Sequence, residues 1–273
     1  AKGFTVIQTV ILSELDGSDG INRPLINGSP STPDPDYFKW VDRVLEIAGE
    51  KGLYVGLLPT WGDKVDKQWG AGPEIFDEAN AREYGRWLGR RYADTPNIIW
   101  IIGGDRSGEG KNFTVCKAMA EGIKECDKRH LMAYHPQGEH SSSFWFHDET
   151  WLDFNMFQSG HRRYGQRKGD GDYPIKENTE EDNWRFVEAS TLNPLKPVID
   201  DEPIYENIPQ GLHDPNETRW NEHDVRRYAY WSVFAGSFGH SYGHNDIMQY
   251  IRPGVLGSFG ADGMKKAWCD ALE

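Results

Sequence analysis

Short apolar runs alternate along this chain with amphipathic segments, and the two kinds of segment have different periods. Residues 4–12 are rich in β-branched side chains, which is typical of a strand. Residues 36–51 place Phe38, Val41 and Leu45 at spacings of three and four, so these side chains share one face of a helix. This alternation predicts parallel strands joined by right-handed helical crossovers.

The same pattern continues through the 273 residues. It predicts strands at residues 4–12, 53–58, 97–102, 131–135, 153–158, 197–200 and 238–242, and helices at residues 36–51, 77–93, 113–128, 178–190, 224–235 and 265–272. A closed barrel needs eight strands. A doubly wound sheet usually has a glycine-rich nucleotide turn after its first strand, and this chain has none. We therefore predict an α/β fold, a single (β/α)8 TIM-barrel domain over residues 1–273, whose first strand and helix precede residue 1.

The charge of the chain narrows the range of partners. Asp and Glu number 43 against 30 Lys and Arg, a net charge of -13, and phosphate backbones repel such a chain. No apolar run approaches the roughly 18 residues of a membrane span. We expect neither a nucleic-acid partner nor membrane insertion.

The chain begins Ala-Lys-Gly-Phe, without Met or a signal peptide, as expected of a piece of a longer protein.

The cysteines give no sign of a disulfide framework or a metal centre. Cys116 and Cys126 lie ten residues apart in one predicted helix, too far apart along its axis for a disulfide. With Cys269 the count is odd, and no Cys-x-x-Cys spacing occurs. We expect three ordinary thiols, no bound metal and no cofactor.

Aromatic residues make up 13% of the chain and include 11 Trp, which suits either a large core or stacking on sugar rings. Trp61 and Trp69 lie in a glycine-rich loop after a predicted strand and are candidates for stacking on a sugar. Trp40 and Trp87 fall in predicted helices and are expected in the core. Residues 144–146, Phe-Trp-Phe, could form a platform at the rim or simply cover the barrel.

Two carboxylates follow predicted strands that face each other in a barrel. Asp105 follows residues 97–102 and two glycines, and Glu202 lies just beyond residues 197–200. Counted with a missing first strand, these are strands four and seven, whose carboxyl ends lie across the mouth of the barrel. Two carboxylates that flank one bond are what glycoside hydrolysis requires. The structural alternative is that Asp105 pairs with Arg106 and that Glu202 caps a helix.

Polar and aromatic side chains also follow nearly all of the remaining predicted strands, and these side chains are candidates for binding a substrate. These candidates are Trp61, Arg106, His135, Gln158, His161, Asp201, Tyr205, His240 and Tyr242.

Two other classes of protein fit the same strand ends. A metal-dependent barrel hydrolase would place ligands at His135 and His161, but it would usually carry a His-x-His on its first strand, which this chain lacks. A non-catalytic sugar-binding barrel would normally have lost Asp105 or Glu202, and both are present. Bound metal with chelator-sensitive activity would indicate the first alternative.

Several longer motifs resemble glycoside hydrolase family 140, the apiosidase family. These motifs are residues 57–62, 84–92, 97–106, 134–136, 141–143, 152–155, 158–161 and 201–203. The resemblance extends over nearly the whole chain, from residue 3 to about residue 270. It implies a (β/α)8 barrel in which Asp105, in the Gly-Gly-Asp-Arg run, is the catalytic acid/base and Glu202, in the Asp-Glu-Pro run, is the nucleophile.

The same resemblance implies a substrate and a location. Members of the family release apiose from pectic side chains and are usually secreted by bacteria. It therefore implies a retaining hydrolase of plant cell-wall glycans, acting on rhamnogalacturonan-II side chains, that is secreted, periplasmic or held at the cell surface. Its partner would be an oligosaccharide or polysaccharide.

A retaining mechanism makes three structural expectations. The carboxyl groups of Asp105 and Glu202 should lie about 5–5.5 Å apart. Burial and the like charge of Glu202 should raise the pKa of Asp105, which must be protonated to act as an acid. The side chain of Arg106 should point away from Asp105, because successive side chains alternate along an extended segment.

Overall fold

The computed structural model describes residues 3–13, 23–163, 165, 182–211, 214 and 216–248. The strands are β1 (Val6–Leu12), β2 (Tyr54–Thr60), β3 (Ile98–Arg106), β4 (Met132–Pro136), β5 (Asn155–Phe157) and β6 (Val198–Asp200). The helices are α1 (Pro35–Glu50), α2 (Glu78–Tyr92), α3 (Gly110–Cys126), α4 (Ser143–Phe146), α5 (Asp182–Ser190), α6 (Glu222–Phe234) and α7 (Asn245–Met248), with 3-10 turns at Ile26–Gly28 and Gly62–Lys64.

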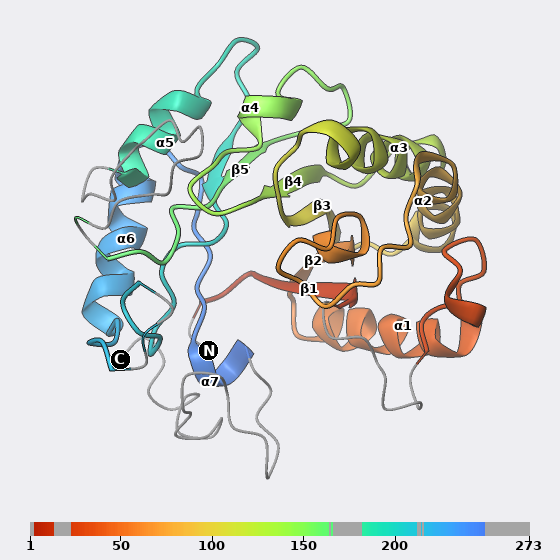
Figure 1. Cartoon of the computed structure of the whole chain (residues 1–273), viewed down its shortest axis with the longest axis horizontal. Coiled ribbons are helices and arrows are strands. Elements are labelled where there is room, and N and C mark those ends of the chain that lie inside the picture. The colour runs from red at the N-terminus through yellow and green to blue at the C-terminus, as the bar shows by residue number, and fades with distance from the viewer. Residues whose placement is uncertain are drawn as a thin grey trace. The chain divides into compact units, whose positions relative to one another are not determined.

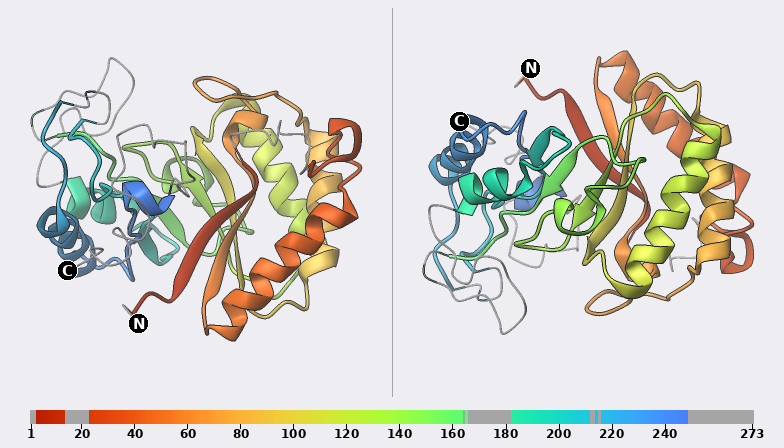
Figure 2. Two further views of the ribbon diagram at one scale, coloured as in Figure 1. Left: turned by 90° about the horizontal axis from the view of Figure 1, so that it is seen from below. Right: turned by 90° about the horizontal axis from the view of Figure 1, so that it is seen from above.

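The chain divides into two compact units. The first unit comprises Ala1–Gln137 and Phe144–Phe154, and the second comprises Gly138–Ser143 and Asn155–Glu273. In the first unit β1 to β4 form a parallel sheet in chain order, and α1, α2 and α3 lie side by side on one face of it (Figures 1 and 2). Every consecutive pair of strands is thus joined by a helix, as the alternation of periods predicts.

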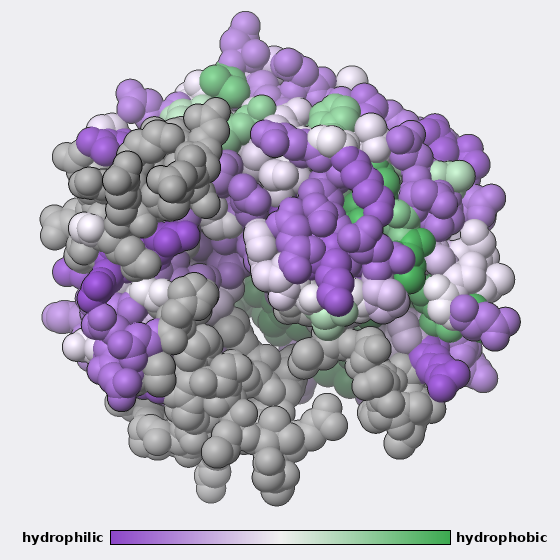
Figure 3. Space-filling model, in the orientation of Figure 1, coloured by the Kyte–Doolittle hydropathy of each residue, from purple (hydrophilic) through white to green (hydrophobic). Residues whose placement is uncertain are grey.

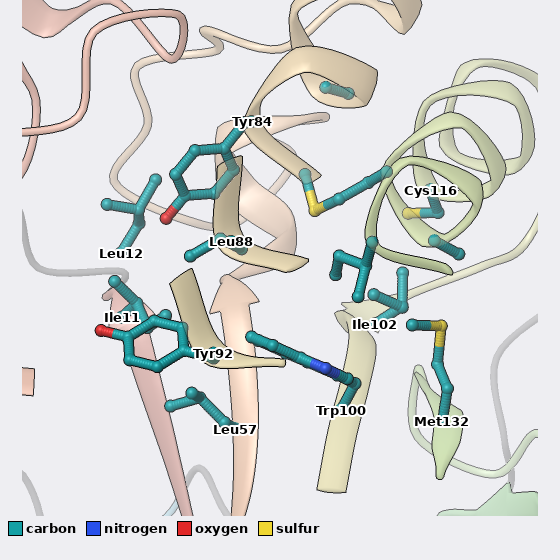
Figure 4. Close-up of a cluster of buried hydrophobic side chains, with 14 of the residues drawn as sticks. Ile11, Leu12, Leu57, Tyr84, Leu88, Tyr92, Trp100, Ile102, Cys116 and Met132 are labelled. Carbon is teal, nitrogen blue, oxygen red and sulfur yellow. The ribbon is translucent and has the colours of Figure 1, made fainter. Parts of the chain in front are cut away.

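The core of the first unit lies between this sheet and its helices. Tyr84, Leu88 and Tyr92 of α2 belong with Trp100 of β3 to one cluster of buried hydrophobic side chains (Figure 4). The indole of Trp100 is buried, and its Nε1–H donates to Asp127 Oδ2 over 2.8 Å, so its one polar atom is satisfied. The first half of β3 is therefore anchored on a well-packed layer.

The second unit contains the parallel pair of β5 and β6, with Asn155 opposite Val198 and Phe157 opposite Asp200. Phe157 stacks on Phe186 of α5, with ring centroids 5.4 Å apart. A separate apolar cluster gathers after β6 and on α6, and it consists of Ile204, Ile208, Trp220, Val225 and Tyr228.

Most predicted elements are confirmed, with bounds shifted by a few residues. The predicted strand at residues 238–242 is reduced to a single parallel bridge between Asp200 and His240. The predicted helix at residues 265–272 lies outside the described residues, as does the start of the one at residues 178–190. That one barrel unit precedes residue 1 stays a prediction. In the described part of the chain, no helix combines the length and apolar character needed to cross a membrane.

The prediction that Trp40 belongs to the core is wrong. Trp40 is 68% exposed because it lies two positions after the buried Phe38, about 200° further round α1. Trp87 does pack against the core, with its ring centroid 4.5 Å from that of Phe38. Cys116 and Cys126 are free thiols in α3, as expected, and Cys269 lies outside the described residues.

Candidate active site

The end of β3 carries a bulge that turns Asp105 out of the regular strand. Gly103 pairs with His135 and Arg106 pairs with Pro136, so Gly104 and Asp105 are two extra residues on β3. Gly103, Gly104 and Asp105 all have positive φ, of 95°, 114° and 63°. Asp tolerates the left-handed region better than most side chains, and strain of this kind concentrates at functional sites. The Gly-Gly-Asp-Arg run thus directs the Asp105 side chain through its backbone.

Asp105 is half-buried, and an aromatic ring donates to it. The indole Nε1–H of Trp69 donates to Asp105 Oδ2 over 3.3 Å. Trp69 belongs to the loop of residues 61–76 between β2 and α2, where Lys67 and Gln68 are also exposed. Side chains over this loop are mostly hydrophilic on the face that Figure 3 shows. The glycine-rich loop predicts a stacking role for Trp69, but nothing in the sequence indicates this contact with the acid.

Arg106 is 1% exposed, and its guanidinium is bonded to main-chain oxygens. Nε donates to the carbonyl of Asp66 over 2.7 Å, Nη2 to that of Lys67 over 3.0 Å, and Nη1 to that of Asp105 over 2.8 Å. The Arg106 side chain is expected to point away from Asp105 because successive side chains alternate along a strand. The bulge breaks that alternation, so this reason is wrong. Arg106 instead ties the loop of residues 61–76 to the end of β3; a contact with substrate stays a prediction.

Trp61 and His135 lie together in the first unit. Their ring centroids are 5.3 Å apart at an interplanar angle of 67°, an edge-to-face contact. His135 is buried, and its Nδ1 lies 3.0 Å from the Pro136 carbonyl oxygen, which can only accept. Nδ1 therefore carries a proton. The half-buried Trp61 follows β2 directly, so the predicted stacking role remains available to it.

In the second unit Glu202 and His161 form one pair. His161 Nε2 lies 2.9 Å from Glu202 Oε1, and the two side chains are 12% and 13% exposed. Because a carboxylate accepts, Nε2 carries the proton in this hydrogen bond. The His161 ring lies 4.4 Å from that of Tyr205, centroid to centroid. Three predicted site residues of the second unit are thus adjacent, and the carboxylate that is expected to attack is held by a ring N–H.

Asp200 supports the segment that carries Glu202 from within the core. Its Oδ2 accepts hydrogen bonds of 2.9 Å from Ser159, Asn183 and Ser232, which belong to three different parts of the second unit. Burial nevertheless outweighs these donors and raises the pKa of Asp200 to about 7. The end of β6 is therefore fixed by a buried, fully bonded carboxyl group.

The other predicted residues of the second unit divide by exposure. Gln158 and Asp201 are buried, whereas Tyr205, His240 and Tyr242 are half-buried. Burial lowers the pKa of His240. Contact of any of these five side chains with substrate stays a prediction.

Glu206, which is not among the predicted site residues, belongs to the same cluster of polar residues. It is buried and accepts a 2.6 Å hydrogen bond from the hydroxyl of Tyr242. Burial first, and then this hydrogen bond to a carboxylate, raise the pKa of the Tyr242 phenol. A parallel bridge to His244 holds Glu206 in place. Its place beside Tyr205, in the stretch that follows the predicted strand at residues 197–200, is the signal in the sequence.

The two carboxylates belong to different units, Asp105 to the first and Glu202 to the second. Their separation therefore stays a prediction, and so does the expected pKa of Asp105. Among the described residues, no group of three or more His, Cys, Asp or Glu side chains is placed to hold a metal ion.

Comparison with solved structures identifies the class of protein. The chain is similar over 99% of its length to a protein described as a glycoside hydrolase, with 50% identity and a TM-score of 0.85. It is similar over 99% of its length to a glycoside hydrolase family 5 protein from Bacteroides vulgatus ATCC 8482, with 56% identity and a TM-score of 0.83. It spans 61% and 58% of these two proteins, about three fifths of their length.

A more distant likeness concerns the fold alone. XacCel5A, solved in complex with cellopentaose, shares 12% identity and a TM-score of 0.61, over 99% of this chain and 87% of that one. These likenesses confirm the predicted fold class, α/β of the (β/α)8-barrel type.

The particular family follows from the sequence as a whole. Residues 1–273 match the model of the apiosidase-like catalytic domain, and the chain therefore belongs to that family. A comparison with curated proteins finds no match. The family resemblance that the motifs carry is thus confirmed.

Proposed function

We propose that this chain is the catalytic domain of a retaining glycoside hydrolase in which Asp105 is the acid/base and Glu202 is the nucleophile. The observation that carries the proposal is that each carboxylate lies at or just beyond the carboxyl end of a parallel strand, is partly exposed, and accepts from the N–H of one ring. Trp69 supplies that N–H to Asp105, and His161 supplies it to Glu202. Membership of the apiosidase-like family supports the same roles.

The chemistry proceeds in two steps. In the first, Glu202 attacks the anomeric carbon while Asp105 protonates the leaving oxygen, so the glycosidic bond breaks and a glycosyl ester forms on Glu202. In the second, Asp105 removes a proton from water, and the water oxygen displaces Glu202 from the sugar. The hydrogen bond from His161 orients the Glu202 carboxylate for attack, and it weakens as the ester forms because the oxygen loses its charge.

The proposed substrate is a pectic glycan, and the proposed product is apiose released from rhamnogalacturonan-II side chains. Family membership supports this choice. The same family supports a bacterial origin and a secreted, periplasmic or cell-surface location, where polymeric pectin fragments are met. Screening the protein against aryl glycosides and pectic oligosaccharides tests the choice of sugar; apiose should be the released monosaccharide.

A set of three variants tests the catalytic roles. Glu202→Gln should abolish turnover of every substrate, because no nucleophile remains. Asp105→Asn should retain the first step only with activated leaving groups, which need no proton. Glu206→Gln is the matched control, since its amide oxygen can still accept from Tyr242 and the residue has no proposed part in the chemistry. Full activity of Asp105→Asn on a natural linkage would contradict the proposal.

A further inference from the structure

We propose that Trp69 positions the Asp105 carboxyl group through its indole N–H, and that Arg106 holds the loop of residues 61–76 so that it can do so. The inference rests on the proposed function, in which Asp105 delivers a proton to the leaving group. It assigns to Trp69 a role beyond that of a sugar-stacking ring.

The hydrogen bond determines which oxygen of Asp105 carries the proton. An indole N–H is a donor only, and in a protonated carboxyl group the carbonyl oxygen accepts better than the hydroxyl oxygen, so the Trp69 N–H favours Oδ2 as the carbonyl oxygen. The acid proton is therefore favoured on Oδ1, and the side chain cannot rotate without losing the bond. A general acid with a fixed proton-bearing oxygen starts in the geometry that transfer requires.

Hydrophobic burial does not account for the position of Trp69. The side chain is 61% exposed, which is unusual for the largest aromatic residue. Its contacts are polar or cationic instead. The Arg106 Cζ atom lies 4.7 Å from the centre of the Trp69 ring, and Asp105 accepts from its N–H. Asp105 and Arg106, which are neighbours in β3, thus hold the Trp69 side chain of the loop of residues 61–76.

The loop is fixed on both sides of Trp69. On the N-terminal side, the buried guanidinium of Arg106 donates to the carbonyl oxygens of residues 66 and 67. On the C-terminal side, the buried carboxylate of Asp63 accepts from the Gly72 N–H over 2.7 Å and pairs with Lys64 Nζ at 3.0 Å. A Cβ on Gly70 would overlap the side chain of Asp63. Trp69 lies between these two fixed stretches of the loop.

The other carboxylates near Trp69 in this loop, Asp66 and Glu74, have partners of their own. Asp66 Oδ2 accepts from the side chains of Gln68, at 2.7 Å, and Asn112, at 3.4 Å. Glu74 accepts from the Lys67 N–H over 3.0 Å and pairs with Lys111 at 2.9 Å. Asp105 is therefore the carboxylate whose protonation should register most directly at the Trp69 indole.

Kinetics on a series of leaving groups provide the first test. Trp69→Phe keeps a flat ring and removes the N–H, and Trp40→Phe, at an exposed position of α1, is the matched control. For substrates with poor leaving groups, Trp69→Phe should lower kcat roughly tenfold, the worth of one hydrogen bond. For activated aryl glycosides it should change kcat/KM, which reports the first step, less than about twofold, like Trp40→Phe, because those leaving groups need no proton.

A double-variant comparison separates positioning from sugar binding. If Trp69 acts through Asp105, adding Trp69→Phe to Asp105→Asn should cause no further loss in kcat. If Trp69 only stacks on substrate, the variant should raise KM equally for all leaving groups and its effect should add to that of Asp105→Asn. The second pattern would overturn the inference.

An NMR titration tests the contact independently of activity. The indole 1H–15N resonance that disappears in Trp69→Phe should shift with pH in the wild-type protein, and this shift should be lost in Asp105→Asn. An indole shift that is the same in wild type and Asp105→Asn would overturn the inference. If the shift tracks Asp105 while Asp105→Asn hydrolyses natural linkages normally, then it is the proposed function that fails. If Asp105→Asn is impaired but Trp69→Phe behaves like Trp40→Phe, the inference alone fails.

Discussion

Gly62 and Gly104 lie so close together that neither can carry a side chain. A Cβ on Gly62 would overlap the Gly104 carbonyl oxygen, and a Cβ on Gly104 would lie 2.8 Å from the Gly62 nitrogen. Gly62 opens the loop that carries Trp69, and Gly104 precedes Asp105 in the bulge of β3. This backbone contact therefore sets the distance between the loop and the proposed acid.

Replacing Gly62 should separate the two segments. Gly62→Ala should lower the free energy of unfolding by about 1–3 kcal/mol, as overpacking does, and should reduce hydrolysis of poor leaving groups most. Urea denaturation and kinetics measure the two effects. Gly49→Ala is the control, because Gly49 lies in α1 and its new Cβ would meet Asn97 at an ordinary contact distance of 3.4 Å. Alanine favours a helix more than glycine does, so the free energy of unfolding should be equal or higher. Equal behaviour of the two variants would contradict the close contact.

Asp200 should make the stability of the fold depend on pH. Its pKa is raised to about 7 in the fold, against about 3.9 in an unfolded chain. The folded state therefore binds more protons than the unfolded state between these pH values. The contribution of Asp200 to the free energy of unfolding is complete below about pH 4 and is lost as the pH rises through 7. Across that window the free energy of unfolding should fall by about 1.4 kcal/mol per pH unit relative to Asp200→Asn.

Denaturation of both proteins at several values between pH 5 and pH 8.5 measures this slope. The comparison with Asp200→Asn cancels every other titrating group, and a constant offset from the changed hydrogen bonds does not affect it. The difference in free energy of unfolding between the wild-type protein and Asp200→Asn should level off above pH 7.5. A difference that is flat from pH 5 to pH 7, or that grows in favour of the wild type, would contradict the raised pKa.

The Tyr242 hydroxyl should stabilise the second unit through Glu206. Tyr242→Phe removes a 2.6 Å donor from a buried carboxylate and should cost about 1–3 kcal/mol. The midpoint of urea unfolding should fall with little change in slope. Tyr230→Phe is the control, because Tyr230 is exposed on α6 and should change stability by less than about 0.5 kcal/mol. Equal losses in the two variants would show that the Glu206 contact contributes nothing.

Activity should not depend on a metal ion. The proposed reaction uses two carboxylates and water, so dialysis against a chelator should leave kcat and KM unchanged. Elemental analysis of the active protein should find far less than one equivalent of zinc or manganese. About one equivalent, together with chelator-sensitive activity, would favour the metal-dependent hydrolase that His135 and His161 suggest.

Much of the fold could be predicted because strands and helices here have clear periods. The apolar residues 98–102 predict a buried strand, and the structure buries most of them in β3. The bulge after them could not be predicted, since Gly103 and Gly104 permit unusual backbone without specifying it. The direction of Arg106 depends on that bulge, so strict alternation along a strand is not a sound basis for predicting it.

The site could be predicted only in part, because strand ends are visible in a sequence and contacts between loops are not. Asp105, Glu202 and His161 were found from their places after strands. The contact of Trp69 with Asp105 depends on a loop closed by Asp63 and Lys64, and no local pattern encodes that closure. For Trp40 the predicted helix is correct, but the apolar stripe of Phe38, Val41 and Leu45 leaves Trp40 on the opposite face.

Covalent labelling of the nucleophile tests the central claim most directly. A 2-deoxy-2-fluoro glycoside with an activated leaving group, of the sugar that the substrate screen identifies, should inactivate the protein by accumulating the glycosyl ester. Peptide mapping by mass spectrometry should place the added mass on Glu202, and Glu202→Gln should remain unlabelled. A label on Glu206 or another residue, or the absence of any ester in an enzyme whose first product has inverted configuration, would contradict the account.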